Sequence, residues 1–561
     1  MLPKFKEIPK NQLSIFPTQL DSLIPQDHIC RAIDSFVEGL PMNLVGKYFL
    51  NKPSNEGGRP AYHPKLILKL LLYSYTTPYR SSHELEKLAK ESIPCMWLLS
   101  GETPDHATIS RFRSKYLKDV LEDIHVNLVL NLAKHELVNL EEYVLDGTLI
   151  NANANKYKTV FKKNAERYSQ QVRTKVQEYI HTLENLEKES IHQNEVLDIP
   201  SETSCSDSNK IKEIAHKIDE QLSKRGNDRV TKKQKTQCRN IIRKADQLNG
   251  YEQQLQTLDS RNSYSKTDTD ATYMRMKNRE YANGYNVQVG TSKGFITGVT
   301  LHQTSSDQKA FIPHVAKYEE WYGKGTLKHI VADGGYGSER TFTWMEQRKI
   351  IPYVKFPGYY QQTKEAYKKN QFIAKNMPYY EDGDYYLCPN DQKLEWYGQR
   401  IKIHKNGYKN IIQEYRCKKC NTCPLKNKCT TAEYRKIMIS ENANRLRAKA
   451  THFLKTEEGK KKSKMRGHDI ETVFGHLKKN LKLDSFLLRG KDNVNIEMLL
   501  FTISYNLIKL LKSGFLLRGE QLIVLLYAYL YRRNKWLKIK NSSFLNCLCS
   551  YDLKMKSIWN F

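Results

Sequence analysis

Residues 464–490 read KMRGHDIETVFGHLKKNLKLDSFLLRG, and the rest of the chain is organised around this stretch. At the 3.6-residue period of a helix, one face is apolar and carries Ile470, Phe474 and Leu477. A different face carries one acid, one residue without a side chain and one base: Glu471, Gly475 and Lys478. A glycine inside a helix costs about 1 kcal/mol relative to alanine. Its use beside a carboxylate therefore indicates close approach by a bulky group such as a nucleic-acid backbone; the alternative is an ordinary solvated helix face.

Two further acids stand at the ends of short apolar runs. Asp146 follows residues 143–145 in EEYVLDGTLINANA, where we expect Gly147 to end a buried strand. Asp333 follows residues 329–332 in KHIVADGGYGSE, ahead of a glycine-rich loop and a helix. The carboxyl ends of strands are the usual place for sites in sheets flanked by helices. Aspartates at strand ends also commonly cap helices or form turns, which is the competing interpretation of each acid alone.

Taken jointly and in order, LDGT, ADGGY and ETVFGHLKKN followed by FLLRG resemble the insertion-sequence transposases of the Asp-Asp-Glu type. The chain is most similar to the insertion-sequence family numbered eleven-eighty-two, which has a cysteine-rich insertion before the glutamate. The resemblance runs from about residue 59 to residue 508. Related transposases often carry an arginine four residues before the glutamate, but this chain has Gly467 there and Arg466 one place earlier. The lysine seven residues after the glutamate is present as Lys478, and a phosphate contact is implied for it.

The resemblance implies a DNA transposase that binds terminal inverted repeats, cleaves DNA by metal-dependent hydrolysis and transfers the 3′ ends into target DNA. Asp146, Asp333 and Glu471 would be the catalytic acids and would hold two Mg²⁺ or Mn²⁺ ions, with Asp146 bridging both. Two such cations activate the attacking oxygen and stabilise the leaving oxygen, so no side-chain nucleophile is required. A homodimer in the DNA complex is also implied. Three other acids are alternatives for the third role: Asp307, which we favour among them, Asp268 and Asp270.

The charge of the chain indicates a polyanionic partner. Its 561 residues carry 91 Lys and Arg against 61 Asp and Glu, a formal net charge of +30. Neutralising phosphates releases condensed counterions, so this excess favours DNA. No apolar run reaches the roughly 18–20 residues that a membrane-spanning helix needs, and the N-terminus lacks the apolar region of a signal peptide. We therefore expect no membrane partner and a cytoplasmic location, associated with the nucleoid in a prokaryote.

Residues 1–135 are predicted to form an all-α DNA-binding domain. A buried helix is expected from Pro64, and Ser81 with Glu84 makes a capping box for the next helix. A turn and a basic helix follow, an order that is plausible for DNA reading, although basic helix faces are also common without DNA. The basic side chains of this helix that we expect to contact DNA are Arg111, Arg113 and Lys115.

The catalytic core is predicted from residues 136–155 and 265–357. The strand of Asp146, a hairpin turning at residues 292–294, and alternating helices and strands around Asp333 indicate an α/β mixed sheet with flanking helices. The resemblance, rather than the pattern, implies that this core is ribonuclease-H-like. The remaining segments are a helical pair or coiled-coil insertion, the glutamate helix with a packing helix, and a basic C-terminal tail, at residues 156–264, 464–512 and 513–561.

Residues 358–463 are predicted to form a second insertion, rich in Tyr and Lys, with clustered cysteines. Four follow the spacing C-x2-C-x2-C-x5-C and one lies upstream: Cys417, Cys420, Cys423, Cys429 and Cys388. Cytosolic cysteines this close suit zinc binding better than disulfides, and a structural zinc site takes four ligands. We favour Cys420, Cys423 and Cys429 as three of them, while Cys388 and Cys417 compete for the fourth place. The alternative is a cluster of unliganded thiols.

Two other functions account for part of the pattern. A metal-dependent nuclease or resolvase on the same fold would share the three acids and the basic charge but would lack strand transfer. A zinc-containing DNA-binding protein without catalysis would explain the charge and the cysteines, but not three acids at strand and helix rims. Strand-transfer assays separate the first alternative, and DNA binding without cleavage would favour the second.

Overall fold

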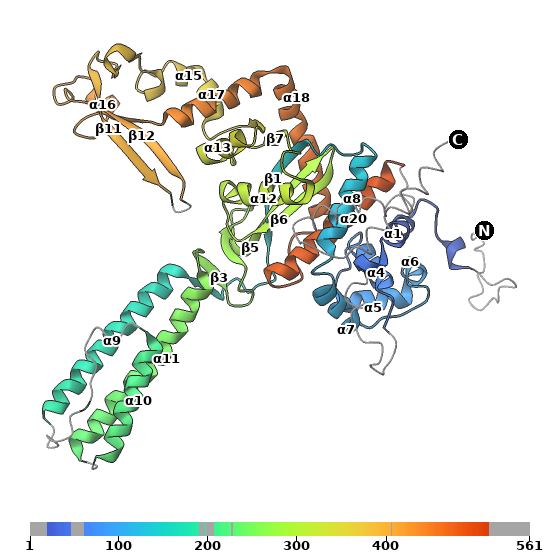
Figure 1. The fold of residues 1–561 in the computed structure, drawn as a ribbon, viewed down its shortest axis with the longest axis horizontal. Coiled ribbons are helices and arrows are strands. Elements are labelled where there is room, and N and C mark those ends of the chain that lie inside the picture. The colour runs from blue at the N-terminus through green and yellow to red at the C-terminus, as the bar shows by residue number, and fades with distance from the viewer. Residues whose placement is uncertain are drawn as a thin grey trace, which may run out of the picture.

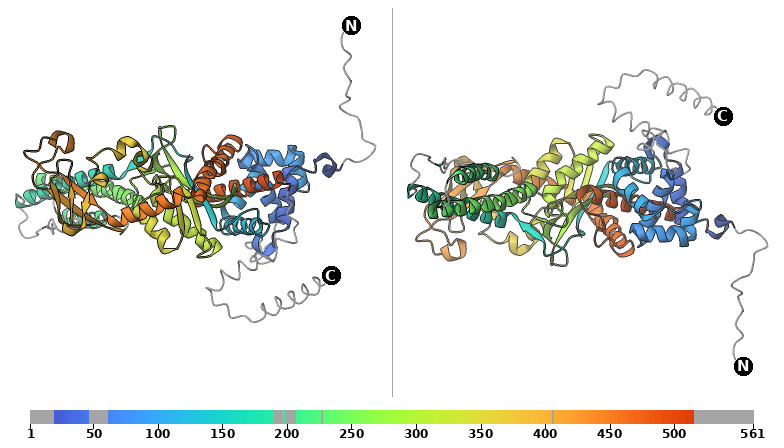
Figure 2. Two further views of the ribbon diagram at one scale, coloured as in Figure 1. Left: turned by 90° about the horizontal axis from the view of Figure 1, so that it is seen from above. Right: turned by 90° about the horizontal axis from the view of Figure 1, so that it is seen from below.

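The computed structural model describes residues 19–45, 61–189, 197, 207–225, 228–404 and 407–514. The molecule is elongated, with the N-terminal helices at one end and two projecting insertions at the other (Figures 1 and 2). A central sheet flanked by helices lies between these ends (Figure 1). The basic tail predicted for residues 513–561 lies, from residue 515 onward, outside the described residues.

The described part of the chain before residue 135 is helical. Its elements are η1 (Leu20–Leu23), α1 (Ile29–Glu38), α2 (Met42–Val45), α4 (Pro64–Ser74), α5 (Ser82–Glu91), α6 (Ile93–Leu98), α7 (His106–Arg111), the π-helical turn η2 (Phe112–Tyr116) and α8 (Leu121–Lys134). The predicted capping box is confirmed, because Ser81 Oγ accepts from Glu84 N and Glu84 Oε2 accepts from Ser81 N. Asp105 caps α7 by accepting from Thr108 N at 2.7 Å.

The central sheet has the strand order β4-β5-β1-β7-β8, with β6 paired to the same strand β5. Its strands are β1 (Glu142–Asn151), β4 (Thr272–Arg275), β5 (Tyr281–Ser292), β6 (Phe295–His302), β7 (His329–Ala332) and β8 (Ile351–Val354). β1, β7 and β8 are parallel, whereas β5 runs antiparallel to β1 and β6. The predicted hairpin is confirmed: Lys293 and Gly294 both have positive φ, as a tight turn between twisted strands requires.

The prediction that Gly147 ends its strand is wrong. β1 continues to Asn151, with Gly147 paired to Gln288 of β5. The parallel pairing of β1 with β7 stops earlier, at Leu145 and Ala332. The short apolar run, residues 143–145, therefore marked only the part of β1 that pairs with the parallel strand β7.

Helices cover both faces of this sheet. On one face lie α12 (Asp307–Tyr322) and α13 (Glu339–Gln347), where Tyr143 of β1 is hydrogen-bonded to His314 at 2.7 Å. On the other face lies a long helical series: α17 (Glu441–Lys455), α18 (Glu457–Arg466), the π-helical turn η6 (Gly467–Glu471), α19 (Thr472–Gly475), the π-helical turn η7 (His476–Asn480) and α20 (Lys491–Lys512). The predicted apolar stripe of this series, Ile470, Phe474 and Leu477, is buried.

Helix α20 joins the N-terminal helices to the sheet. Ser504 Oγ donates to Leu72 O of α4, while Asn506 exchanges hydrogen bonds with the backbone of Ile296 in β6. By length and composition alone α20 is apolar enough to cross a membrane, but 78% of its most apolar window is buried inside the protein. Its apolar composition is therefore accounted for by packing between the two parts of the fold.

The first insertion is an arm of three helices rather than the predicted pair. It comprises β2 (Thr159–Phe161), α9 (Lys162–Lys188), α10 (Ser208–Lys224), α11 (Arg229–Leu258) and β3 (Ser263–Ser265). Antiparallel pairing of β2 with β3 closes its base. Leu183, Ile211 and Ile218 of α9 and α10 are buried, and α11 also contributes to the core of the arm.

The second insertion contains a separate five-stranded sheet in the order β13-β12-β11-β10-β9. Its elements are α14 (Tyr359–Thr363), α15 (Glu365–Lys368), η4 (Ala374–Asn376), β9 (Tyr379–Tyr380), η5 (Glu381–Gly383), β10 (Tyr385–Leu387), β11 (Lys393–Ile403), β12 (Lys409–Cys417), α16 (Lys426–Cys429) and β13 (Lys436–Ile439). The long β11–β12 hairpin projects beyond the central sheet (Figure 1).

A buried carboxylate of α20 stabilises the loop that follows the glutamate helix. Glu497 is fully buried and accepts from the backbone N–H groups of Leu487 and Leu488, each at 2.9 Å. The Arg80 guanidinium lies 3.7 Å away and also lies over the Phe501 ring. Burial raises the pKa of Glu497, while the two N–H groups and Arg80 oppose that rise.

We therefore expect Glu497→Leu to destabilise the protein by on the order of 3–5 kcal/mol, because two buried N–H groups and a nearby arginine lose their acceptor. Glu497→Gln should cost clearly less, since its amide oxygen still accepts. Urea unfolding followed by circular dichroism measures both variants. Equal midpoints for wild type and the leucine variant would contradict this role.

Candidate active site

Asp146 lies in the middle of β1 on the face covered by the glutamate helix series. Its Oδ1 accepts from Gly147 N at 2.8 Å, and its Oδ2 lies 3.3 Å from Nη1 of Arg466. Burial raises the pKa of Asp146, and nearby Asp333 adds to the rise, whereas the Gly147 N–H and Arg466 oppose it. The sheet thus holds a carboxylate where its negative charge is only partly compensated.

Asp333 follows β7 directly, beside the point where Asp146 leaves the parallel ladder. Leu145 and Ala332 are the last parallel partners, so the two aspartates are the next residues of neighbouring strands. Asp333 Oδ1 accepts from Gly335 N at 2.9 Å, which fixes the carboxylate over its own loop. Parallel pairing therefore brings together two acids that are 187 positions apart along the chain.

Glu471 lies at the end of the π-helical turn η6, which packs against β1 and β5. Its side chain is exposed and extends back over Gly467, where an added Cβ would lie 3.7 Å from Glu471 Oε1. Among the described residues, Glu471 is not grouped with the two aspartates within 4.8 Å. The predicted third acid thus belongs to the helix series that covers the Asp146 face of the sheet, but it does not lie within joint ligand distance of the other two acids.

The π-helical turn explains the displaced arginine. A π-helical turn closes its hydrogen bonds over five residues rather than four, so residues five apart share a face. Arg466 precedes Glu471 by five positions and reaches Asp146 across η6. The one-residue departure in the sequence is therefore absorbed by backbone geometry, and Arg466 lies at the site despite its altered spacing.

The predicted DNA-contacting side chains have different environments. Lys478 is half-buried, donates to Thr148 Oγ1 of β1 at 2.7 Å, and has its pKa lowered by burial. Arg111 and Lys115 are exposed. Arg113, however, is only 3% exposed and donates to Arg80 O at 2.9 Å. The prediction of a direct DNA contact is therefore contradicted for Arg113, because its guanidinium is used inside the N-terminal helices.

Two of the alternative acids are occupied with loop contacts. Asp268 is buried, accepts from the Tyr285 hydroxyl and also accepts from Gly490 N at 3.2 Å. Asp270 accepts from Lys491 N at 2.9 Å. Both carboxylates hold the segment that leads into α20, so their contacts indicate a structural role.

A buried polar array lies behind the two aspartates, and the sequence interpretation missed it. Asn286 and Gln288 of β5 are fully buried, and both donate from their side-chain amides to Oδ1 of Asp307 at 2.9 Å. The Tyr336 hydroxyl donates to Gln288 Oε1. Gly147 makes room for this array, since an added Cβ would lie 2.5 Å from Gln288 Nε2 and 2.7 Å from Asp307 Oδ1. Alternation of amides with valines in β5 (NVQV, residues 286–289) was the available signal.

The five predicted cysteines surround one small cavity. All are free thiols, and the cavity has a volume of about 20 Å³. Cys388 Sγ accepts from the backbone N–H groups of Asn390 and Gln392, and Cys420 Sγ accepts from Arg435 N. Within the described residues no three sulfur atoms all lie within 4.8 Å of one another, so a bound ion would have to draw the thiols closer.

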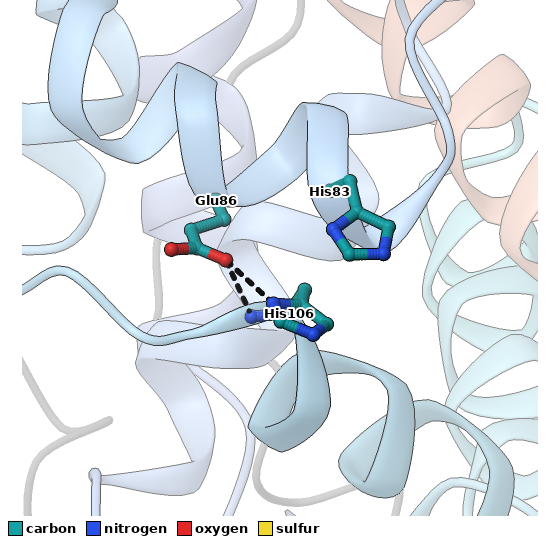
Figure 3. A group of neighbouring side chains, drawn as sticks. All are labelled: His83, Glu86 and His106. Atoms are coloured by element: carbon teal, nitrogen blue, oxygen red, sulfur yellow. Dashed lines mark hydrogen bonds and ion pairs between the residues drawn. The ribbon is translucent and has the colours of Figure 1, made fainter.

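A second group of metal-type ligands lies in the N-terminal helices (Figure 3). His83, Glu86 and His106 are the described residues whose ligand atoms all lie within 4.8 Å. Glu86 Oε2 already accepts from both N and Nδ1 of His106, and Glu86 Oε1 pairs with Lys90. The two imidazole rings are stacked with centroids 4.0 Å apart. Because the two rings are stacked, their nitrogen lone pairs lie in similar planes and do not converge on one point, as ligands of a metal ion would. The contacts of these three residues therefore link α5 to α7.

Two family models match the chain. Residues 387–511 match the model described as "Transposase DDE domain", and residues 18–115 match the one described as "Transposase domain (DUF772)". The matches support a transposase of the Asp-Asp-Glu type. The first matched segment contains the cysteine cluster and Glu471, and the second covers the N-terminal helices through Lys115. Searches of the curated proteins and of the solved structures each found no match.

The need for a glycine at position 147 can be tested by comparing its substitution with that of a glycine that has free space around it. Gly147→Ala should destabilise the protein by about 1–3 kcal/mol, because the new methyl group must displace hydrogen-bonded atoms of the buried array. Gly250→Ala is the control, since an added Cβ there has nothing within 4 Å. In the interior of α11 it should be neutral or stabilise by up to about 1 kcal/mol. Thermal unfolding compares them, and an unchanged Gly147→Ala transition would contradict the tight packing.

Proposed function

We propose that the chain is an insertion-sequence transposase that binds terminal inverted repeats, cleaves DNA by phosphodiester hydrolysis and transfers the 3′ ends into target DNA. The observation that carries the proposal is the meeting of Asp146 and Asp333 at adjacent parallel strands, under a helix that presents Glu471 from the matched transposase segment. The proposal includes a homodimer in the DNA complex and membership of the family numbered eleven-eighty-two.

The topology supports a ribonuclease-H-like core. The chain forms a central strand, an antiparallel hairpin on one side of it and two parallel strands on the other, with helices between the later strands. Both insertions enter at connections between core elements. The strand order is therefore kept while the segments that lead to Glu471 are lengthened.

The donor set at the site suits hard divalent cations. Asp146, Asp333 and Glu471 offer only carboxylate oxygens, which Mg²⁺ and Mn²⁺ prefer, and these residues would hold two such ions. When bound, the ions activate the attacking oxygen and stabilise the leaving oxygen of the phosphodiester. The chain itself contributes a rigid strand that fixes Asp146, a loop that fixes Asp333, and a helix that carries Glu471 and Lys478 over the same strand.

Basic side chains would bind and position the DNA. The formal net charge of +30 favours phosphate binding, and the exposed Arg111 and Lys115 support DNA contact by the N-terminal helices. Lys478 of η7 contacts β1 two residues beyond Asp146, where its Nζ donates to Thr148 Oγ1. A phosphate held there would be next to the carboxylates.

A nuclease or resolvase would share these features, and the products of the reaction separate the alternatives. Pre-cleaved terminal-repeat DNA with a free 3′ hydroxyl should be joined to target DNA by the transposase. Hydrolysis without joined products would favour the nuclease. Binding with neither product would favour a DNA-binding protein that lacks catalysis.

Substitution of any one of the three acids should lower the rate of DNA cleavage without lowering DNA affinity. Asp146→Asn, Asp333→Asn and Glu471→Gln should each lower the cleavage rate by at least about 100-fold, since a lost metal ligand removes several kcal/mol and about 1.4 kcal/mol is tenfold. DNA affinity should change little, because a carboxylate without its cation repels phosphate. Cleavage and binding are measured on the same labelled terminal-repeat DNA.

The matched control is Glu457→Gln, an exposed glutamate of α18 that pairs with Lys460. It should retain wild-type cleavage. Normal cleavage by Glu471→Gln would remove Glu471 from the catalytic set, even if the two aspartates were essential.

We further propose that the cysteine cavity holds a structural zinc ion. Thiolate sulfur is a preferred zinc ligand, and the backbone N–H groups directed at Cys388 and Cys420 would stabilise thiolates. Five sulfur atoms surround the cavity, and a tetrahedral site takes four.

Freshly purified protein should therefore carry about one zinc ion per chain, measured by plasma mass spectrometry. Serine substitution of the five cysteines one at a time should abolish zinc binding in four variants and leave it in one, which identifies the spare thiol. Cys95→Ser, in the N-terminal helices, is the control and should keep its zinc. Unchelated wild-type protein without zinc would contradict this proposal.

A further inference from the structure

Asp307 is the first residue of α12, and its carboxylate is hydrogen-bonded to side chains of the central sheet. Its Oδ1 is held by two buried amides, from Asn286 and Gln288, which belong to the strand next to β1. An ideal Cβ on Gly147 would lie 2.7 Å from this oxygen, so the oxygen occupies space that a side chain at position 147 would need. The carboxylate is therefore fixed beside the peptide that carries Asp146, from the opposite face of the sheet.

The second oxygen of Asp307 faces the Asp333 loop. An ideal Cβ on Gly335 would lie 3.7 Å from Asp307 Oδ2 and 3.0 Å from Asp333 Oδ1, so both carboxylates border the same point. Among the described residues, no donor is hydrogen-bonded to Asp307 Oδ2, and no Lys or Arg is ion-paired with Asp307 or Asp333. One oxygen is thus immobilised while the other stays available.

The charges at this point are unbalanced. Asp307, Asp146 and Asp333 all lie close enough to the Tyr336 hydroxyl to raise its pKa, after burial itself. Arg466 pairs with Asp146 and lies on the other face. Carboxylates that border one partly buried region repel one another, and a cation between two of them would offset that repulsion. Buried amides that fix one of them add a desolvation cost, which a purely helix-capping aspartate would not require.

We propose that Asp307 is a fourth carboxylate of the active site, whose Oδ2 binds a divalent cation together with Asp333. This inference rests on the proposed function, because it adds a ligand to the same metal site. The buried array of Asn286, Gln288 and Tyr336 acts through Asp307, as the group that holds its first oxygen in place. Asp307 is then an addition to Glu471 and not its substitute.

Manganese binding by the full chain tests the ligand directly, without DNA or turnover. Titration with Mn²⁺, with the free ion followed by electron paramagnetic resonance, gives the number of bound ions and their affinities. Asp307→Asn keeps an acceptor for the two amides but loses the charge at Oδ2. We expect it to weaken one Mn²⁺ site by on the order of 10-fold or more, as loss of a ligand or of a residue that orients one does. Asp333→Asn should weaken the same site.

The matched control is Asp492→Asn, which removes an exposed aspartate from the first turn of α20. Like Asp307→Asn, this substitution removes a negative charge from the first turn of a helix. Asp492, however, is ion-paired with Lys118. Its manganese affinity should equal that of wild type. If Asp307→Asn fails to fold, Asp307→Ser, which suits a helix start, provides the same measurement.

The outcomes separate this inference from the proposed function. Weakened binding in Asp307→Asn with an unchanged control supports the inference. Wild-type affinity in Asp307→Asn, together with weakened binding in Asp146→Asn and Asp333→Asn, overturns it and leaves the proposed function intact. Manganese binding that none of the three substitutions changes overturns both.

Discussion

The pairing of β1 with neighbours of opposite direction is the constraint on which the site depends. The parallel neighbour β7 stops at Ala332, whereas the antiparallel neighbour β5 pairs with β1 from Val144 to its end at Asn151. Asp146 therefore stands at a step in the sheet, with hydrogen-bonded backbone on one edge and an open edge where Asp333 begins. A strand that ended at Gly147 would lose the ladder that holds Asp146 rigid.

The helix series that packs on this part of the sheet contains a π-helical turn, which compensates for the shifted position of Arg466 in the sequence. An α-helix advances by 100° per residue, so moving the arginine one place along the sequence would rotate it away from the sheet. The π-helical turn from Gly467 to Glu471 removes that rotation and returns Arg466 to Asp146. Gly467 then lies beside the Glu471 side chain, where an added Cβ would be in van der Waals contact with the carboxylate. Spacing along a sequence is thus an incomplete guide to spacing on a face wherever a helix contains such a turn.

Local chemistry explains which features could be predicted from sequence. The strand before Asp333, the capping box at Ser81 and the hairpin turn at Lys293 depend on residues within a few positions of one another, and all are found as expected. The features that sequence interpretation missed depend on distant partners. Gly147 continues its strand because β5 pairs with it, and Arg113 is buried because the carbonyl of Arg80 takes up its guanidinium.

The same distinction applies to the site. Each acid could be found from its own motif, since an aspartate after a short apolar run is a local signal. For the array around Asp307 the sequence offers only the alternation of amides with valines in β5, because the carboxylate that these amides hold belongs to another element. The overall charge matters as well, because a formal +30 favours long-range attraction of polyanions, whereas the carboxylates of the sheet would repel a phosphate group. Under the proposed function, cations between the carboxylates and the phosphate would reconcile this attraction with this repulsion. DNA affinity and catalysis would then depend on different residues of one surface.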